Sequence, residues 1–331
     1  MPVEHAKRYA PEYGPHHFSN HFPMTVYALR KIGAAGSALT EFSQAYLGQL
    51  EAVEPSGGTE TIDLENFKIH LGKRNYYRAY FDFFQQRITP EDPVPLFKLL
   101  IPGQSASAFH ALIRLAYGIA AKNKSEIAAG LAYMAASYLP LSLEANVCAL
   151  DRCDTVASLG EKVLVAQQEN TLASLPRIRS IFRQMEAALG EAERHKLVQA
   201  AYDAKDISLE DISRLSLDLF LRTNDFTVLH AVTASHAARI VLPYAEDEKL
   251  FLREFFASII LSVLTVESGA FGQKRFAPAA IKPWDSLIAR ALDSLDSHDV
   301  KFVFSCREEQ EHYQEPGYLL AAQLWLFGSQ E

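Results

Sequence analysis

Apolar residues recur at helical spacing along most of the chain, whereas alternating β-branched runs bounded by hairpin turns are hard to find. Start signals for helices are present as well. Ser19 is predicted to cap a helix whose first turn accommodates Pro23, and Asp211 precedes another run of helical periodicity. The pattern therefore predicts an all-α fold.

Two segments are apolar on nearly every side and predict buried helices. Residues 255–266 (FFASIILSVLTV) are too few to cross a bilayer and are flanked by Glu254 and Glu267, so they predict a core helix. Residues 107–138 are rich in alanine, glycine and serine, which is typical of a helix in the middle of a protein. Within them, Gly118 and Gly130 are expected at close helix crossings.

Breaks rich in proline and glycine separate these helical segments, but none is long enough to be a flexible linker between domains. They lie at 54–60, 88–95, 101–107 and 276–284. No fixed-period repeat or low-complexity tract is present. We therefore predict a single domain over residues 1–331, with an arrangement in two helical lobes left open.

Composition and charge exclude several classes of protein. The net charge of −8 and the absence of a basic cluster interleaved with aromatic residues argue against nucleic-acid binding. Three cysteines without a CxxC pair predict neither a disulfide framework nor a structural zinc site, which favours a reducing compartment. The N-terminus is polar and lacks the apolar core of a signal peptide, so we expect a cytoplasmic protein with no membrane segment.

The histidines carry the most chemical information. Several of the eleven lie in apolar helices, where an unsatisfied imidazole costs about 1–3 kcal/mol. His17 and His21 have the i, i+4 spacing that places two imidazoles on one helix face, a common arrangement for binding a metal. The alternative is a polar cap region, since Ser19 and Pro23 place the helix start between them.

His110 opens a polar stripe within an otherwise apolar helix. Arg114 and Tyr117 follow it one and two turns later. A buried polar stripe of this kind is often functional. The alternative is a core histidine bonded to a backbone carbonyl or to Tyr117.

The remaining candidates lie further along the chain. His230 and His236 share a predicted helix at 225–242, but six residues separate them by about 240° around its axis, so both do not face one centre. His236 is expected to have a surface or supporting role. His298 and Lys301, spaced i, i+3, share a face of what reads as an ordinary amphipathic helix.

Other catalytic signatures are absent from the sequence. It contains no GxSxG, GxxxxGK[ST] or HExxH motif, and no GxGxxG after a strand. A nicotinamide or flavin held on a Rossmann unit is therefore not expected.

Four collinear blocks resemble the signature of the questin oxidase-like family. They are HHFSNHFPMTVYALRKIGA (16–34), AFHALIRLAYGIA (108–120), DFTVLHAVTA (225–234) and SHDVKFVFS (297–305). The resemblance implies a helical oxidoreductase. Relatives are associated with oxygenative ring opening of anthraquinones, and at least one is understood as a non-haem iron enzyme whose metal is held by four histidines and a carboxylated lysine.

Carried over residue by residue, the resemblance implies a metal site. Its ligands would be His17, His21, His110, His230 and Lys301, with the partner of His21 left open between His16 and His17. Imidazoles and one hard oxygen ligand suit Fe(II). A lysine supplies that oxygen only as a carbamate, which requires a neutral amine, and burial beside a cation lowers the lysine pKa in that direction.

The function predicted from the sequence is an iron-dependent oxygenase that acts with O2 on an aromatic or quinone-like small molecule. Arg114 and Tyr117 are hypothesised to position an enolate or superoxide. Two alternatives remain open. One is a helical protein that binds a hydrophobic ligand without turnover, and the other is a metal-free oxidoreductase of the same fold that takes electrons from NADPH.

Overall fold

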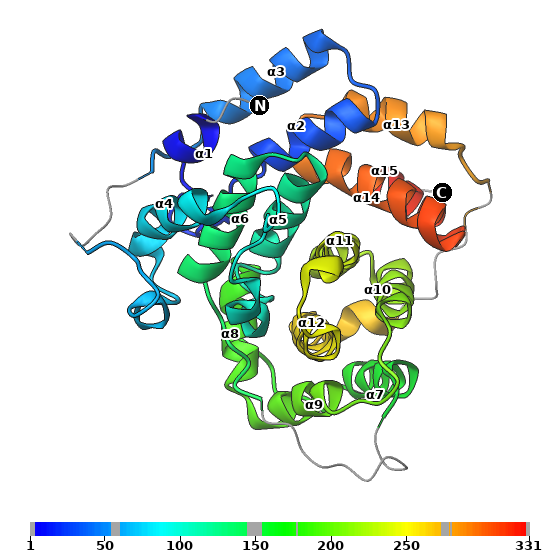
Figure 1. The fold of residues 1–331 in the computed structure, drawn as a ribbon. Helices are drawn as coiled ribbons and strands as arrows, with labels where there is room; N and C mark the ends of the chain where they lie inside the picture. The colour runs from blue at the N-terminus through cyan, green and yellow to red at the C-terminus, as the bar shows by residue number, and fades with distance from the viewer. Residues whose placement is uncertain are drawn as a thin grey trace.

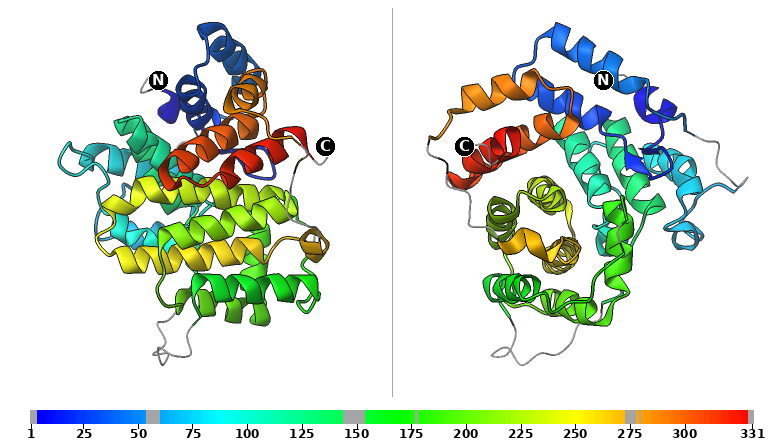
Figure 2. Two further views of the ribbon diagram at one scale, coloured as in Figure 1. Left: turned by 90° about the vertical axis from the view of Figure 1, so that its right-hand side faces the viewer. Right: turned by 180° about the vertical axis from the view of Figure 1, so that it is seen from behind.

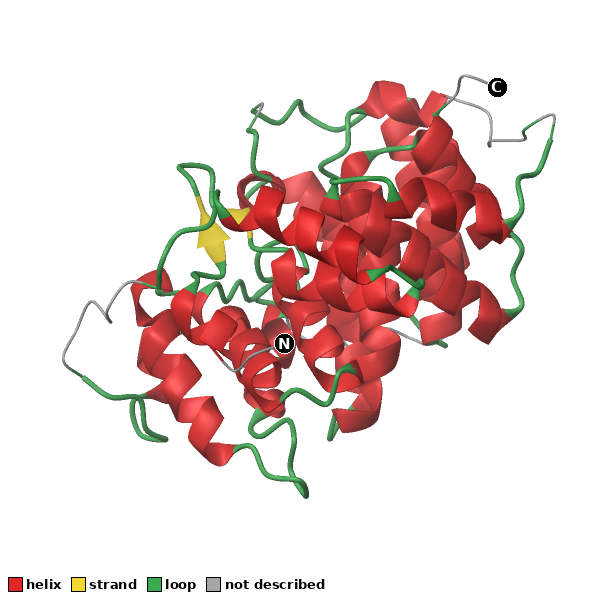
Figure 3. Cartoon of the chain, turned by 90° about the horizontal axis from the view of Figure 1, so that it is seen from above, coloured by secondary structure: helices red, strands yellow, loops and turns green. Residues whose placement is uncertain are grey.

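The structure is a computed structural model that describes residues 4–53, 60–143, 154–176, 178–272, 278 and 280–328. Within these ranges helices account for nearly all regular structure, and a single two-stranded antiparallel sheet lies near the N-terminus, at one edge in Figure 3. The all-α prediction is confirmed.

The first part of the chain forms the hairpin and the helices around α5 and α6. The elements are α1 (Glu4–Arg8), β1 (Glu12–Tyr13), β2 (Phe18–Ser19), α2 (Phe22–Lys31), α3 (Gly36–Leu47), η1 (Phe67–His70), η2 (Arg74–Tyr76), α4 (Tyr77–Arg87), η3 (Phe97–Leu99), η4 (Ile101–Gly103), α5 (His110–Ala120) and α6 (Lys124–Ala136).

The second part contributes the longer helices. They are α7 (Val156–Gln168), α8 (Ile181–Leu189), α9 (Ala192–Tyr202), α10 (Leu209–Thr223), α11 (Phe226–Val241), η6 (Leu242–Tyr244), α12 (Glu248–Val263), η7 (Ser268–Gly272), α13 (Trp284–Leu292), α14 (Ser297–Tyr313) and α15 (Gly317–Phe327). Helices α10, α11 and α12 run alongside one another, as Figure 2 shows from the side.

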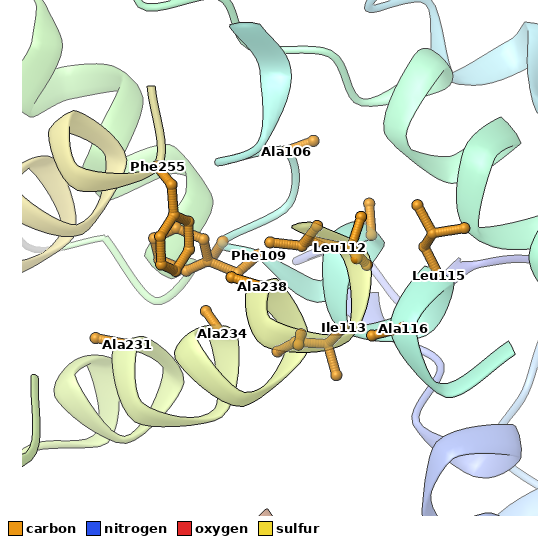
Figure 4. Packing of buried hydrophobic residues seen from close by; sticks show 14 of the residues in the cluster. Ala106, Phe109, Leu112, Ile113, Leu115, Ala116, Ala231, Ala234, Ala238 and Phe255 are labelled. Carbon is orange, nitrogen blue, oxygen red and sulfur yellow. The ribbon is translucent and has the colours of Figure 1, made fainter. Parts of the chain in front are cut away.

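Helices α2, α5, α11 and α14 pack around one another in the interior of the protein. Helix α5 packs against α6, α11 and α2, while α14 packs against α2 and α11 (Figure 1). Figure 4 shows the apolar contact between α5 and α11, with Phe109 beside Phe255 and with Ala234 and Ala238 on the facing side of α11. Four elements far apart in sequence therefore surround one interior region.

The two apolar segments form buried helices as predicted. Residues 255–266 belong mostly to α12, and residues 107–138 form α5 and α6. A Cβ atom on Gly118 would lie 2.7 Å from the backbone nitrogen of Ile127, and one on Gly130 would lie 2.5 Å from the Cα of Leu115. Both glycines are thus at close crossings of α5 and α6, as expected.

Two predicted helix starts were wrong by a few residues. Ser19 lies in β2, and the residue that precedes α2 is His21, with Pro23 in the first turn. Helix α10 is capped by Ser208, so Asp211 already lies in its first turn.

The predicted breaks fall between helices where the chain is described. Residues 88–95 lie between α4 and η3, and residues 101–107 precede α5. The predicted break at 54–60 lies outside the described residues except for residue 60. Most of 276–279, the first part of the predicted break at 276–284, also lies outside them. Within the described ranges, every helix is too short or too polar to cross a bilayer. The single-domain organisation stays a prediction.

Candidate metal centre

His21 enters the interior at the junction between the hairpin and α2. The Tyr46 hydroxyl accepts a hydrogen bond from its backbone N–H at 2.9 Å, which fixes the chain where α2 begins. Its ring Nδ1 lies 2.9 Å from the hydroxyl of Ser297, the first residue of α14. The imidazole is thereby tied to an element 276 positions away in sequence.

His110 is the first residue of α5 and follows an unusual stretch of backbone. Ser107, Ala108 and Phe109 all have left-handed conformations, with φ of 47°, 53° and 68°. Such conformations cost about 1–3 kcal/mol each for residues other than glycine and cluster at functional sites. The turn brings the Ser107 carbonyl oxygen 2.6 Å from Nδ1 of His110. The strained backbone therefore fixes the orientation of the His110 imidazole.

His298 lies in the first turn of α14, and His230 lies one turn into α11. Nδ1 of His230 donates to the carbonyl oxygen of Phe226 at 2.7 Å, and Nδ1 of His298 donates to a carboxylate oxygen of Asp296 at 2.9 Å. Asp296 is also the N-cap of α14. The residue that starts the helix thus also orients the histidine.

The four imidazoles share one bonding pattern, in which Nδ1 is engaged and Nε2 is left over. Carbonyl and carboxylate oxygens only accept hydrogen bonds, so Nδ1 of His110, His230 and His298 carries the hydrogen and Nε2 carries the lone pair. Metal-ligating histidines are oriented by such bonds in many proteins. Nε2 of His21 and of His230 is buried without any hydrogen-bond partner among the described residues.

Burial keeps these imidazoles neutral. It lowers the pKa of His110 to about 3, and the nearby Lys301 amine adds to the effect. The pKa values of His21 and His230 lie well below the ordinary range, because burial is reinforced by the neighbouring cationic and imidazole groups. The pKa of His298 is also lowered by burial, although Asp296 opposes the shift. Neutral imidazole is the form that binds metals.

Lys301 lies among the four histidines, one turn after His298 on α14. Its side chain is 5% exposed. Burial lowers the pKa of Lys301 to about 7, with Asp296 opposing the shift. A large fraction of a buried amine of this kind is neutral at physiological pH.

The spacing of the rings fits a shared ion. Ring centroids lie 4.8 Å apart for His21 and His110, 4.7 Å for His21 and His298, 4.7 Å for His110 and His230, and 5.6 Å for His230 and His298. With a metal–nitrogen bond of about 2.1 Å, neighbouring ligand rings at right or tetrahedral angles have centroids about 4.5–5.3 Å apart. Three of the four separations lie in that range.

The side chains of the cluster do not form a coordination sphere in this structure. Within the ranges that the structure describes, no three histidine, cysteine, aspartate or glutamate side chains stand in an arrangement that would hold a metal ion. The donor set fits a nitrogen-binding metal, and its present geometry is loose.

A pocket of about 410 Å³ lies next to the cluster, and all four imidazoles contribute to its walls. Its walls carry aromatic side chains from the hairpin, α3, α8 and α11. They are Tyr13, Phe18, Tyr46, Phe182 and Phe226. Aromatic walls with a few convergent polar groups are typical of a site for a flat organic ligand.

The structure brings together four of the five residues proposed as ligands and adds one more. His21, His110, His230 and Lys301 lie in the cluster, whereas His17 lies on the pocket wall with its side chain 45% exposed and its Nδ1 3.4 Å from Glu12. His298 takes the remaining place. The sequence held a signal for it, because His298 and Lys301 share a helix face, but their spacing is equally typical of an ordinary surface helix.

Arg114 and Tyr117 do not face this pocket. They line a separate pocket of about 310 Å³ between α2 and α5, and no histidine of the cluster contributes to its walls. Arg114 forms a buried ion pair with Glu126 at 3.0 Å. Tyr117 packs in an aromatic group with Tyr27 and Phe304. Spacing along α5 placed them correctly one and two turns after His110, but helix rotation turns them toward other neighbours.

His236 lies apart from the cluster, as the angular separation from His230 predicts. Its Nδ1 lies 3.0 Å from the hydroxyl of Ser305, and its ring contacts Tyr117 and Phe304. It is fully buried rather than at the surface.

The fold and the cluster together define a helical protein with a buried, nitrogen-rich site beneath an aromatic pocket. The family model described as questin oxidase-like matches residues 18–211 and 220–306. The chain therefore belongs to the questin oxidase-like family, which implies an oxidoreductase. His21, His110, His230, His298 and Lys301 all lie within the matched residues, and His17 lies just outside them. No curated protein matches the chain.

Proposed function

We propose that this protein is a non-haem iron-dependent oxygenase that acts on an aromatic or quinone-like small molecule. One observation carries the proposal: four neutral imidazoles from four helices converge beneath an aromatic pocket, each with Nδ1 engaged and Nε2 left over. A buried Nε2 without a partner is costly, and among the described residues the Nε2 atoms of His21 and His230 are of this kind. His236 shares the pattern but lies alone, so it is the grouping of the imidazoles that supports a shared ligand.

The residues proposed to hold the metal are His21, His110, His230, His298 and Lys301. As an ammonium, Lys301 would repel a metal ion. Reaction of its neutral amine with carbon dioxide forms a carbamate and releases one proton, which replaces the positive charge by a negative oxygen ligand. Burial of the Lys301 side chain, which lowers its pKa to about 7, supports this modification because it favours the neutral amine.

Iron, when bound, supplies the redox chemistry that activates molecular oxygen. The chain's own residues bind and orient the substrate. Phe18, Phe182 and Phe226 offer flat apolar surfaces to an aromatic ring, and the imidazoles form the floor on which the reacting edge of that ring would lie. Access from the pocket limits the substrate to a small molecule.

Metal analysis of protein purified without chelator tests the proposal. We expect about one iron per chain in the wild type and a loss of most of it in His110→Ala, His230→Ala, His298→Ala and Lys301→Met. His236→Ala is the matched control, because this histidine is equally buried but lies outside the cluster. Unchanged iron in both His110→Ala and His230→Ala would overturn the proposal.

Oxygen consumption with a panel of hydroxyanthraquinones tests the reaction itself. Turnover should require iron, and parallel assays with and without NADPH would show whether an external reductant takes part. Mass analysis of the products from ¹⁸O2 would count the oxygen atoms incorporated.

A second candidate is a protein that binds a hydrophobic aromatic ligand in the same pocket without turnover. The loose arrangement of the cluster favours it, since none of the described side-chain groups already has metal-binding geometry. Tight binding of a hydroxyanthraquinone by protein that contains no iron and consumes no oxygen would establish this alternative.

A further inference from the structure

A buried carboxylate lies behind the wall of the aromatic pocket. Glu12, in β1, accepts hydrogen bonds from Arg74 at 2.7 Å, from the Ser107 hydroxyl at 2.7 Å and from the Tyr133 hydroxyl at 3.1 Å. Its side chain is 8% exposed. A carboxylate fixed by three donors from three other elements has a well-defined position.

The fourth group at Glu12 is His17. Its Nδ1 lies 3.4 Å from Oε2 of Glu12, while its ring stands on the wall of the pocket above the histidine cluster. It also borders a smaller cavity of about 230 Å³ that contains Glu12 and Arg74. His17 therefore separates the buried carboxylate from the space available to the substrate.

The backbone holds His17 in this position at a cost. Its φ is 54°, in the left-handed region that is uncommon for residues other than glycine, and its N–H donates to the carbonyl of Gly14 at 3.1 Å. Strained residues of this type persist where the surrounding structure fixes them, and they cluster at active sites.

We propose that His17 is the acid–base residue of the site, which accepts a proton from an acidic hydroxyl of the bound aromatic substrate, and that Glu12 positions it. This inference rests on the proposed function, because it needs an aromatic substrate in the pocket. It gives His17 a role different from the metal ligation that the family resemblance implies.

The step is a simple proton transfer. The substrate O–H bond breaks, its electron pair stays on oxygen as an aryloxide, and the proton forms a bond to Nε2 of His17. Nδ1–H of the resulting imidazolium donates to Glu12, which stabilises the positive charge. No electron is transferred.

Other charged and titratable groups surround this pair. Arg74 and Tyr133 face Glu12, while His16, Arg179, Asp296 and His298 lie on the pocket walls. Glu12 is paired with Arg74, and it is also the carboxylate in contact with His17. The acid–base behaviour of a bound phenol is therefore expected to depend on His17 more than on the other groups.

The test uses 2-hydroxyanthraquinone, whose hydroxyl is too far from the ring carbonyls to bond internally, and the full-length protein from which metal has been removed by a chelator. The aryloxide absorbs at longer wavelength than the phenol, so spectra across a pH series report its ionisation. In the wild type, we expect half-ionisation about one pH unit below that of the free compound, a tenfold change in the ratio of the two forms.

His17→Asn is the informative variant, because asparagine tolerates a left-handed backbone but does not take up a proton at neutral pH. It should return the midpoint to that of the free compound, and Glu12→Gln should give an intermediate value. His312→Asn, an exposed histidine at the end of α14, is the matched control and should behave as the wild type. Thermal unfolding of each variant checks that it is folded.

Metal content separates this inference from the proposed function. His17→Asn should retain the iron that His110→Ala loses. Loss of iron in His17→Asn would make His17 a ligand and overturn the inference. So would the absence of excess aryloxide in the wild type, or an equal excess in the wild type and His17→Asn. None of these results depends on whether the iron-loaded enzyme turns over.

Discussion

At the residue scale, the side chains that carry the site are set by their nearest backbone groups. The carbonyl of Ser107 orients His110, that of Phe226 orients His230, and the cap residue Asp296 orients His298. Each acceptor lies two to four positions away from the histidine that it fixes. The sequence near these three histidines therefore determines their tautomers, whereas Nδ1 of His21 contacts Ser297, 276 positions away.

Glu254 is a residue whose position in the structure differs from the one that its sequence context predicted. It borders an apolar run and looked like a polar edge, but it is buried in α12 with Oε2 unpaired among the described residues. Burial raises its pKa from the ordinary value of 4.5 to about 7. A carboxyl group with a raised pKa favours the folded state at low pH, and this contribution is lost as pH rises from about 4.5 through about 7.

Glu254→Gln should therefore raise the free energy of unfolding at pH 8 by about 2 kcal/mol and change it little at pH 4.5, since the amide has no ionised form to desolvate. Urea denaturation at the two pH values measures this difference. Glu248→Gln, an exposed position on the same helix, is the control and should show no such pH dependence. A gain of equal size at both pH values would show that ionisation of Glu254 is not the cause.

At this scale the sequence predicted the identity of most cluster residues. It did not predict the direction in which each side chain points. His21, His110, His230 and Lys301 were predicted as ligands from the family resemblance, and the structure gathers them. His17 was predicted as a fifth from the same resemblance, and its i, i+4 spacing to His21 was compatible with a metal site or a polar cap. Because α2 begins only at Phe22, the spacing does not place the two on one helix face. Helical spacing has meaning only where the helix exists.

At the element scale, the pair α5 and α6 holds the centre of the molecule. Helix α5 supplies His110, and its close approach to α6 depends on glycine at Gly118 and Gly130. The composition of residues 107–138 was sufficient to predict buried helical structure with close crossings, but not its division into two helices that pack on each other. The rotation of α5 was not predictable in the same way, since its neighbours decide that Arg114 meets Glu126 instead of the histidine cluster.

Gly130→Ala should destabilise the protein by about 1–3 kcal/mol, the usual cost of forcing extra atoms into a packed interior. The new Cβ would lie 2.5 Å from Cα and 2.6 Å from the nitrogen of Leu115, both of which are backbone atoms of α5. Chemical denaturation measures the loss. Because α5 must move, the variant should also bind iron more weakly in the metal analysis.

The matched control for this helix crossing is Gly36→Ala at the start of α3, where an added Cβ meets no atom within 4 Å. There the same substitution should be neutral or should stabilise by about 0.5 kcal/mol, since it reduces the freedom of the unfolded chain. Equal losses in the two variants would contradict the assignment of Gly130 to a close crossing.

At the scale of the whole molecule, the proposed ligands lie on four helices or their ends, between positions 21 and 301. In Figure 1 these elements, α2, α5, α11 and α14, come from the blue, green, yellow-green and orange parts of the chain and meet around one region. Sequence analysis predicted that helix packing would gather distant histidines into one coordination sphere. The rings of His21 and His230 each lie beside that of His110, while the shared coordination sphere stays a prediction. No local pattern could have shown which helices would be neighbours, because that depends on the packing of the whole core.

A metal held by ligands spread over so much of the chain should couple binding to global stability. An ion that binds only the folded state at 100 times its dissociation constant adds about 2.7 kcal/mol to the free energy of unfolding. We therefore expect the thermal midpoint of chelator-treated wild-type protein to rise by several degrees when Fe(II) is added without oxygen. Scanning calorimetry of the two forms measures the shift. His298→Ala should lose most of the shift, while His236→Ala should keep it, since its imidazole lies outside the cluster. An equal shift in both variants would mean that the ion binds elsewhere, and the four helices would then be joined by packing alone.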